Sequence, residues 1–213
     1  MPDFVRLDSD SYSRLVISSI SALGRAALLA RAAPESRFIL MLRHPWGQIE
    51  SVLRGASHGQ QGWLSPDMIA TLAGTTQARR RGLSADKLAE SPSMVQLAWQ
   101  WVILNEFAHE QLSAAAPHFR LARLFEVNHD PWTHGPQLFA FCGVPWGEQT
   151  IEFVRWSTQG TGKEGYYDMR RDPTDATWGW RRRMTPAEID SISEVVFDSA
   201  LGRMFDVEPP RAK

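Results

Sequence analysis

The chain has 213 residues and a formal net charge of −1, which argues against a general binder of nucleic acid or anionic membranes, because such proteins draw affinity from a large basic excess. A hydrophobic fraction of 43% and a charged fraction of 22% predict an ordinary globular protein, with residues 1–205 as a single domain and 206–213 as a tail. Cys142 is the only cysteine, so no internal disulfide can form. With a polar, acidic start, this predicts a cytoplasmic protein.

The first elements expected along the chain are a short strand at residues 4–7 and a helix over residues 9–33, capped by Ser9 or Asp10. The helix includes the most apolar long stretch of the sequence, but polar residues interrupt it regularly. This pattern predicts an amphipathic helix and no membrane span. The interruptions are Ser18, Ser19, Ser21, Arg25 and Arg31.

The most informative segment follows, where an apolar strand expected at residues 37–42 ends at Arg43. Pro45 then opens a helix over residues 45–55, and a helix start presents free N–H groups with a partial positive charge. Ser51 lies eight residues after Arg43, a little over two helical turns, so its hydroxyl can return toward the strand edge. The layout predicts a local phosphate-binding site.

The middle of the chain is predicted to be helical up to a second strand. Helices are expected over residues 66–82 and 92–116, with Ser65 and Ser91 as N-caps, and the strand over residues 119–126. Two strands joined through helices imply a parallel α/β sheet.

The C-terminal third is expected to contain two short helices, a long polar loop and a final helix. Thr185 and Glu188 flank Pro186 in the pattern of a capping box, which starts the final helix, and Gly202 is expected to close it. The ranges of the first three elements are 136–142, 148–155 and 157–178.

Two further segments join the Arg43 to Ser51 pattern, in order. FRLARLFE at residues 119–126 is followed by Asp130, Pro131 and LFAFCGVP, and the C-terminal region carries GYYDMRRDPTDATWGWRRRMTPAEIDSI. Together the three segments resemble the bacterial sulfotransferases that use 3′-phosphoadenosine 5′-phosphosulfate. The resemblance covers roughly residues 36 to 205.

The resemblance implies a helix-rich α/β protein with the P-loop-NTPase-like sulfotransferase fold. It also implies transfer of a sulfuryl group from the cofactor to a hydroxyl or amine of a small-molecule or carbohydrate acceptor. Arg43 and Ser51 would hold the 3′-phosphate of the cofactor or of its product, adenosine 3′,5′-bisphosphate, and Trp180 and Arg181 would lie at the same cofactor site. No catalytic base is assigned, and no metal is expected.

One family feature has no counterpart before Arg37, namely the Gly-, Ser- and Thr-rich loop that cradles the 5′-phosphosulfate. A late start, a split gene or a genuine loss would each account for it. We therefore expect an incomplete parallel sheet, with three ways to close the gap between the strands. The two strands pair directly, residues 4–7 move in, or another chain completes the sheet in a homo-oligomer or split enzyme. The alternative function is a non-catalytic remnant or partner subunit that keeps part of the nucleotide site for interaction.

Other patterns carry narrower predictions. His129 and His134 do not share a helical face and lack a third strong ligand, so metal binding is not expected there. The arginines at 79–81 are predicted to be solvated at a helix end. For the arginines at 181–183, phosphate contact and a solvated face remain open as alternatives.

Overall fold

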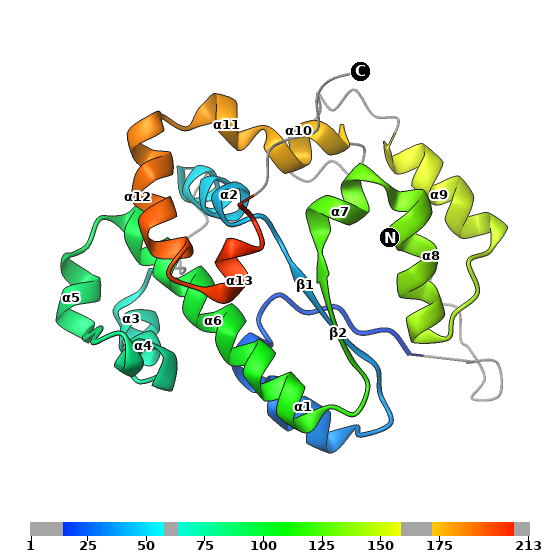
Figure 1. Ribbon diagram of the computed structural model, residues 1–213, viewed down its shortest axis with the longest axis horizontal. Coiled ribbons are helices and arrows are strands. Elements are labelled where there is room, and N and C mark those ends of the chain that lie inside the picture. Colours follow the sequence, from blue (N-terminus) through cyan, green and yellow to red (C-terminus); the bar gives the residue numbers. More distant parts are fainter. Residues whose placement is uncertain (1–14, 58–63, 159–171, 207–213) are drawn as a thin grey trace.

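The computed structural model describes residues 15–57, 64–158 and 172–206 (Figure 1). It is a helix-rich α/β structure in which β1 (Phe38–Leu42) and β2 (Phe119–Arg123) form a two-stranded parallel sheet. The strands pair directly, in a register that runs from Phe38 opposite Phe119 to Leu42 opposite Arg123. The predicted parallel sheet and its first strand are thus confirmed, but the second strand, predicted over residues 119–126, ends at Arg123, because residues 124–126 form the start of a helix. Direct pairing is the observed one of the three ways to close the sheet, while residues 4–7 lie outside the described ranges.

Helices lie before β1 and between the two strands. The elements before β1 are the 3₁₀ helix η2 (Leu23–Arg25) and α1 (Ala26–Ala32). Between the strands lie α2 (Pro45–Ser57), α3 (Pro66–Ala73), α4 (Thr76–Arg80), α5 (Ala85–Glu90) and α6 (Ser93–Ala115).

The chain after β2 is also helical in its described parts. Its elements are α7 (Leu124–His129), α8 (Pro131–Cys142), α9 (Glu148–Thr158), α10 (Pro173–Trp178), α11 (Trp180–Arg183), α12 (Pro186–Val196) and α13 (Ala200–Arg203). None of the described helices is both long and apolar enough to cross a bilayer.

The long helix predicted over residues 9–33 is confirmed only from Leu23 to Ala32 and is wrong for residues 15–22, while residues 9–14 lie outside the described ranges. Residues 15–19 have no regular structure. This run is rich in β-branched residues and serines, which lose rotamer freedom in a helix or compete for its backbone hydrogen bonds. The backbone N–H of Ser21 donates to Ser19 Oγ at 3.3 Å, which is such a competing bond.

The helix predicted over residues 66–82 is divided into α3 and α4 by a second cap. Ser65 caps α3 as predicted, accepting from the Met68 N–H at 3.2 Å. Thr75 then starts α4 by accepting from the Ala78 N–H at 3.2 Å. Ser91 does not cap α6, where Pro92 is the N-cap. The Ser91 hydroxyl instead donates to the carbonyl of Lys87 in α5, and the sequence did not predict this helix.

The predicted starts and ends of the later elements also shift, because local caps decide them. Asp130 caps α8 by accepting from the Thr133 N–H at 3.0 Å, so this helix begins at Pro131 and not at 136. The end of the expected loop forms α10, and residues 159–171 of that loop lie outside the described ranges. The capping box of α12 is confirmed. Gly202 does not close this helix but lies in α13, where a Cβ would stand 1.8 Å from the carbonyl oxygen of Val196.

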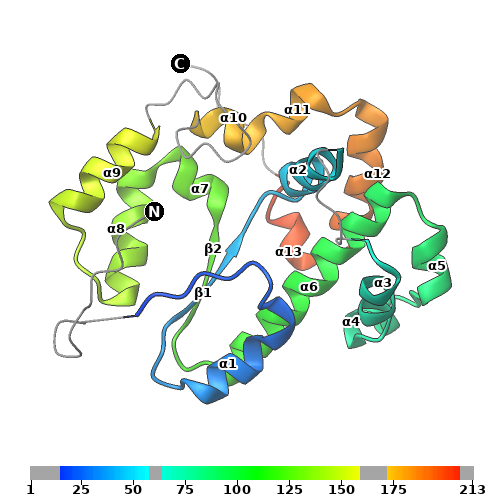
Figure 2. The same ribbon diagram turned by 180° about the vertical axis from the view of Figure 1, so that it is seen from behind.

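The main hydrophobic core surrounds α6, which packs against α1, α2, α12 and both strands (Figure 2). Leu40 and Leu42 of β1 are buried in this core with Trp101 and Val102 of α6 and Ile192 of α12. Because β1 and β2 are parallel, their carboxyl ends lie at the same edge of the sheet. The elements that follow these ends, α2 and α7, both contact α10.

Candidate functional site

The candidate site lies at the carboxyl edge of the sheet, where ligands of open parallel sheets usually bind. Arg43 follows β1 directly and is half-buried. Its backbone carbonyl accepts a hydrogen bond from Trp101 Nε1 at 3.2 Å, which attaches the strand end to α6. Pro45 opens α2 as predicted, and the Gln48 N–H donates to the His44 carbonyl at 2.9 Å. The local layout predicted around Arg43 is therefore present.

The structure brings α11 against α2, although these segments lie about 130 residues apart in sequence. Trp180 stacks on Trp46 with ring centroids 5.5 Å apart. A Cβ on Gly47 would lie 3.3 Å from Trp180 Cδ1, so glycine permits the close contact. Ser51 is half-buried and stands one turn beyond Gly47 on the same face of α2. Two of the predicted segments, around Ser51 and around Trp180, are thus neighbours.

The three consecutive arginines of α11 have different partners. Arg183 donates to the Glu50 carboxylate at 2.8 and 3.2 Å, and Arg182 pairs with Asp175. Arg181 is exposed, and its guanidinium carbon lies 5.4 Å from the Trp178 ring centre and 5.1 Å from that of Trp180. Among the residues that the structure describes, Arg181 has no carboxylate partner. Its guanidinium is therefore available to an external anion.

His44 is enclosed in an aromatic cage, which we define as Trp46, Trp178, Trp180 and Phe205. The ring centroids of these four residues lie 5.0 to 5.3 Å from that of His44. Only 3% of His44 is exposed, and neither ring nitrogen has a hydrogen-bond partner within the described ranges. Burial, reinforced by the charge of Arg181, lowers the pKa of His44 from 6.5 to about 3. The histidine is therefore neutral at physiological pH.

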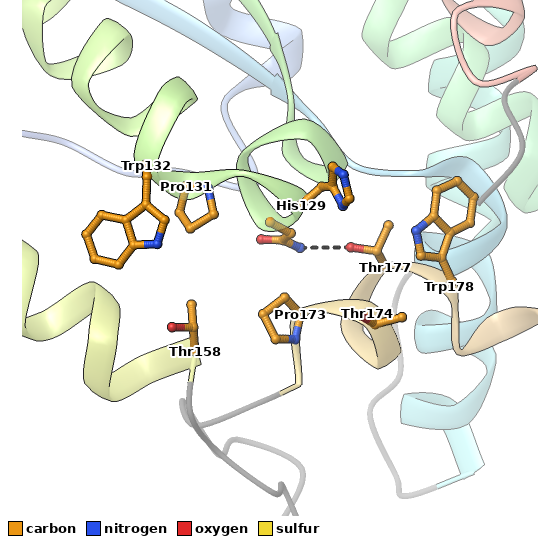
Figure 3. Close-up of a pocket in the computed structure, with 9 residues that line it drawn as sticks. His129, Pro131, Trp132, Thr158, Pro173, Thr174, Thr177 and Trp178 are labelled. Carbon is orange, nitrogen blue, oxygen red and sulfur yellow. Dashed lines mark hydrogen bonds between the residues drawn. The ribbon is translucent and has the colours of Figure 1, made fainter. Parts of the chain in front are cut away.

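A pocket of about 270 Å³ opens beside this cage (Figure 3). Residues from the end of α7, the start of α8, the end of α9 and α10 line it. Asn128 Nδ2 donates to Thr177 Oγ1 at 3.1 Å across its floor. Trp178 lines the pocket and also packs on His44, so the pocket and the cage share one side chain.

Sequence reasoning missed this pocket, since its walls come from segments about 40 residues apart. Several lining residues, such as Pro131 and Trp178, lie in segments that carry the family resemblance, but the sequence assigns none of them to a pocket, and His129 is weighed only as a metal ligand. The described ranges contain no cluster of three or more His, Cys, Asp or Glu side chains suited to a metal ion. A local signal did exist in the Asp130–Pro131 pair, which starts a helix directly after the edge of the sheet.

The prediction for Arg81 is wrong, because this residue is not solvated. Its guanidinium donates two hydrogen bonds to Glu106, at 2.8 and 2.9 Å, and one to Asp198. Although burial opposes the effect, the hydrogen bonds to Glu106 and Asp198 raise the pKa of Arg81. This network joins the end of α4 to α6 and to the segment after α12, away from the candidate site.

Comparison of the chain with protein-family models, curated proteins and solved structures gives no match. The function is therefore inferred from the site's own geometry and from the sequence motifs.

Proposed function

We propose that the protein is a sulfotransferase-like protein that binds 3′-phosphoadenosine 5′-phosphosulfate or its product, adenosine 3′,5′-bisphosphate. Arg43, Ser51 and Arg181 contact the 3′-phosphate in this proposal, with Trp180 beside them. The reaction class is sulfuryl transfer to a hydroxyl or amine of a small-molecule or carbohydrate acceptor, in a cytoplasmic protein. One observation carries the proposal: Arg181 has no carboxylate partner among the described residues, and its helix packs on the helix that bears Ser51.

The donor set suits a phosphate better than a single carboxylate. Two guanidinium groups offer paired N–H donors in a planar arrangement that matches phosphate oxygens. The hydroxyl of Ser51 and the N–H groups at the start of α2 add donors, and the 13-residue helix contributes its dipole. Arg43 and the start of α2 directly follow β1, Ser51 lies on α2, and the helix that bears Arg181 contacts α2.

The expected affinity follows from these contacts. Hydrogen bonds to charged groups contribute about 1.5 to 3 kcal/mol each, and a helix N-terminus about 0.3 to 1 kcal/mol. Two arginine contacts with the helix terminus then give about 3 to 7 kcal/mol, equivalent to a Kd between roughly 4 mM and 10 µM. The proposal covers the 3′-phosphate half of the cofactor and assigns no catalytic base.

Calorimetric titration with adenosine 3′,5′-bisphosphate tests the proposal. We expect Arg43→Ala and Arg181→Gln each to weaken binding at least about ten-fold, the effect of one lost charge-assisted hydrogen bond. Arg182→Ala is the matched control, because Arg182 already pairs with Asp175. Equal affinities for the wild type and Arg181→Gln would refute the assignment. Equal affinity for adenosine 5′-phosphate, which lacks the 3′-phosphate, would refute it as well.

A second candidate is an interaction role without catalysis, in which a second copy of this chain completes the sheet. Leu15, Val16, Ile17 and Ile20 are 78 to 82% exposed in a segment without regular structure. Within the described ranges each strand has one neighbour, so the outer edges of β1 and β2 are open to another strand. Light scattering after gel filtration tests this role with Ile17→Asp: a dimer that dissociates in the variant supports it, and a monomeric wild type excludes it.

A further inference from the structure

The pocket beside the aromatic cage has apolar rings on opposite walls (Figure 3). Trp132 and Pro131 stand on the α8 side, and Trp178 and Pro173 stand on the α10 side. Trp132 is 47% exposed, so a ligand that covers its ring removes apolar surface from water. Flat apolar walls of this kind favour a ligand with a flat, C–H-bearing face.

The polar groups of the pocket are neutral amides, hydroxyls and one imidazole. Among the described residues, the lining contains no Asp, Glu, Lys or Arg, although the Arg155 guanidinium carbon lies 5.9 Å from the ring centre of Trp132. A phosphate, sulfate or carboxylate placed against Asn128 and Thr177 would find no cation among the described lining residues, and a charge removed from water without a partner is disfavoured. The described lining residues therefore favour a neutral ligand or the neutral part of a larger one.

The hydrogen-bonding capacity of Asn128 and Thr177 narrows the ligand further. Asn128 Nδ2 donates to Thr177 Oγ1 at 3.1 Å, which leaves the Asn128 amide oxygen to accept and the Thr177 hydroxyl proton to donate. A ligand hydroxyl satisfies both, because it donates and accepts at once. An oxyanion cannot donate to the amide oxygen, and a hydrocarbon satisfies neither group. Only 5% of Thr177 is exposed, so a mismatch at this place is costly.

We infer that this pocket is a binding site for a neutral polyhydroxylated ring, namely a sugar or cyclic polyol. Its volume of about 270 Å³ lies just below the range of about 300 to 1,000 Å³ typical of sites for drug-sized ligands, so it accommodates a single ring. The C–H face of the ring covers Trp132, and its hydroxyls reach Asn128 and Thr177.

This site is distinct from the proposed phosphate site, because none of Arg43, Ser51, Trp180 and Arg181 lines it. Trp178 connects the two, since it lines the pocket and its ring centre lies 5.4 Å from the Arg181 guanidinium carbon. A role for the bound sugar as sulfuryl acceptor rests on the proposed function. Sugar binding itself does not, and it is tested without nucleotide.

Titration of ¹⁵N-labelled protein with D-glucose, D-galactose, N-acetylglucosamine and myo-inositol, followed through the tryptophan indole N–H signals, tests the site. We expect at least one of these compounds to shift the Trp132 signal in a saturable way, the signal being assigned by its loss in Trp132→Phe. Trp132→Ala should weaken binding at least about ten-fold, the loss of one stacked ring. Thr177→Val, which keeps the side-chain shape, should weaken it about five-fold, the loss of one hydrogen bond. Trp156→Ala is the control, since Trp156 is 45% exposed and does not line the pocket.

Three results would overturn the assignment. The first is no saturable shift with any of the four compounds, and the second is unchanged affinity in folded Trp132→Ala, with folding checked by its melting curve. The third is tighter binding of adenosine or of glucose 6-phosphate than of every neutral compound, which would indicate a nucleobase or anion site. Failure of nucleotide binding in the wild type with sugar binding intact would remove the proposed function and leave this site standing.

Discussion

Replacement of His44 by phenylalanine should remove a large part of the acid sensitivity of the fold. His44 has 3% exposure and two ring nitrogens without partners in the described structure, and its pKa is lowered to about 3 by burial and by Arg181. The native state therefore holds the neutral imidazole, while an unfolded chain binds a proton near pH 6.5. His44→Phe keeps a ring in the cage and cannot be protonated.

The sign and magnitude follow from proton linkage. Between pH 6.5 and about 3, the unfolded state binds one more proton than the native state at His44, so the free energy of unfolding falls as the pH falls. The contribution of the neutral His44 to the free energy of unfolding is therefore fully present above pH 6.5. Each pH unit well below 6.5 removes about 1.4 kcal/mol, so lowering the pH to 4.5 should remove about 2 to 3 kcal/mol.

Urea unfolding of the wild type and of His44→Phe at several pH values from 7.5 to 4.5 measures this contribution as the difference between the two curves. We expect a difference that grows in favour of the variant as the pH falls. At pH 7 the variant should lie within about 1.5 kcal/mol of the wild type, because loss of two unpaired polar atoms offsets a small increase in volume. His118→Phe, at an exposed position, controls for loss of a histidine. A difference that stays constant across this range would refute the argument.

Two further predictions concern stability away from the site. Arg81→Met should lower the free energy of unfolding by about 2 to 4 kcal/mol, since it leaves the largely buried Glu106 carboxylate unpaired. Arg80→Met, which removes an exposed pair, should change it by less than about 1 kcal/mol, and equal effects in chemical denaturation would contradict the reasoning. Gly202→Ala should destabilise by more than about 3 kcal/mol through its contact with the Val196 carbonyl. Gly24→Ala, with no atom within 4 Å, should leave the melting temperature nearly unchanged, and similar losses in both variants would contradict the steric account.

The elements that the sequence predicts well are those specified by neighbouring residues. A continuous apolar run specifies β1, Pro45 opens α2, and Thr185 with Glu188 starts α12. The errors arise where two local preferences compete. Residues 15–22 have the apolar spacing of a helix but the β-branched and serine content of an extended segment, and the second preference prevails. In residues 66–82, the apolar spacing predicts one continuous helix, but the N-cap at Thr75 starts a second helix there.

The candidate site likewise has a part that the sequence predicts and a part that it does not. Arg43 and Ser51 lie in one motif of nine residues, so local spacing alone proposes them. The cage around His44 draws on aromatic rings from α2, α10 and the segment after α13, and no pattern in the sequence indicates that they meet. The pocket likewise depends on how α10 packs against α7. Tertiary contacts between distant segments create both features, and such contacts are not encoded in local periodicity.

The aromatic cage explains how one exposed arginine is held in place at the proposed phosphate site. A long arginine side chain loses rotamer freedom when it binds an anion, and this loss weakens binding unless the side chain is already ordered. Trp178 and Trp180 lie under the Arg181 guanidinium at 5.4 and 5.1 Å, and both rings are fixed by packing on His44. A neutral His44 is required for this arrangement, because an imidazolium in the cage would repel Arg181. In the proposed phosphate site, the buried histidine thus supports anion binding indirectly, by keeping the cage uncharged and its arginine ordered.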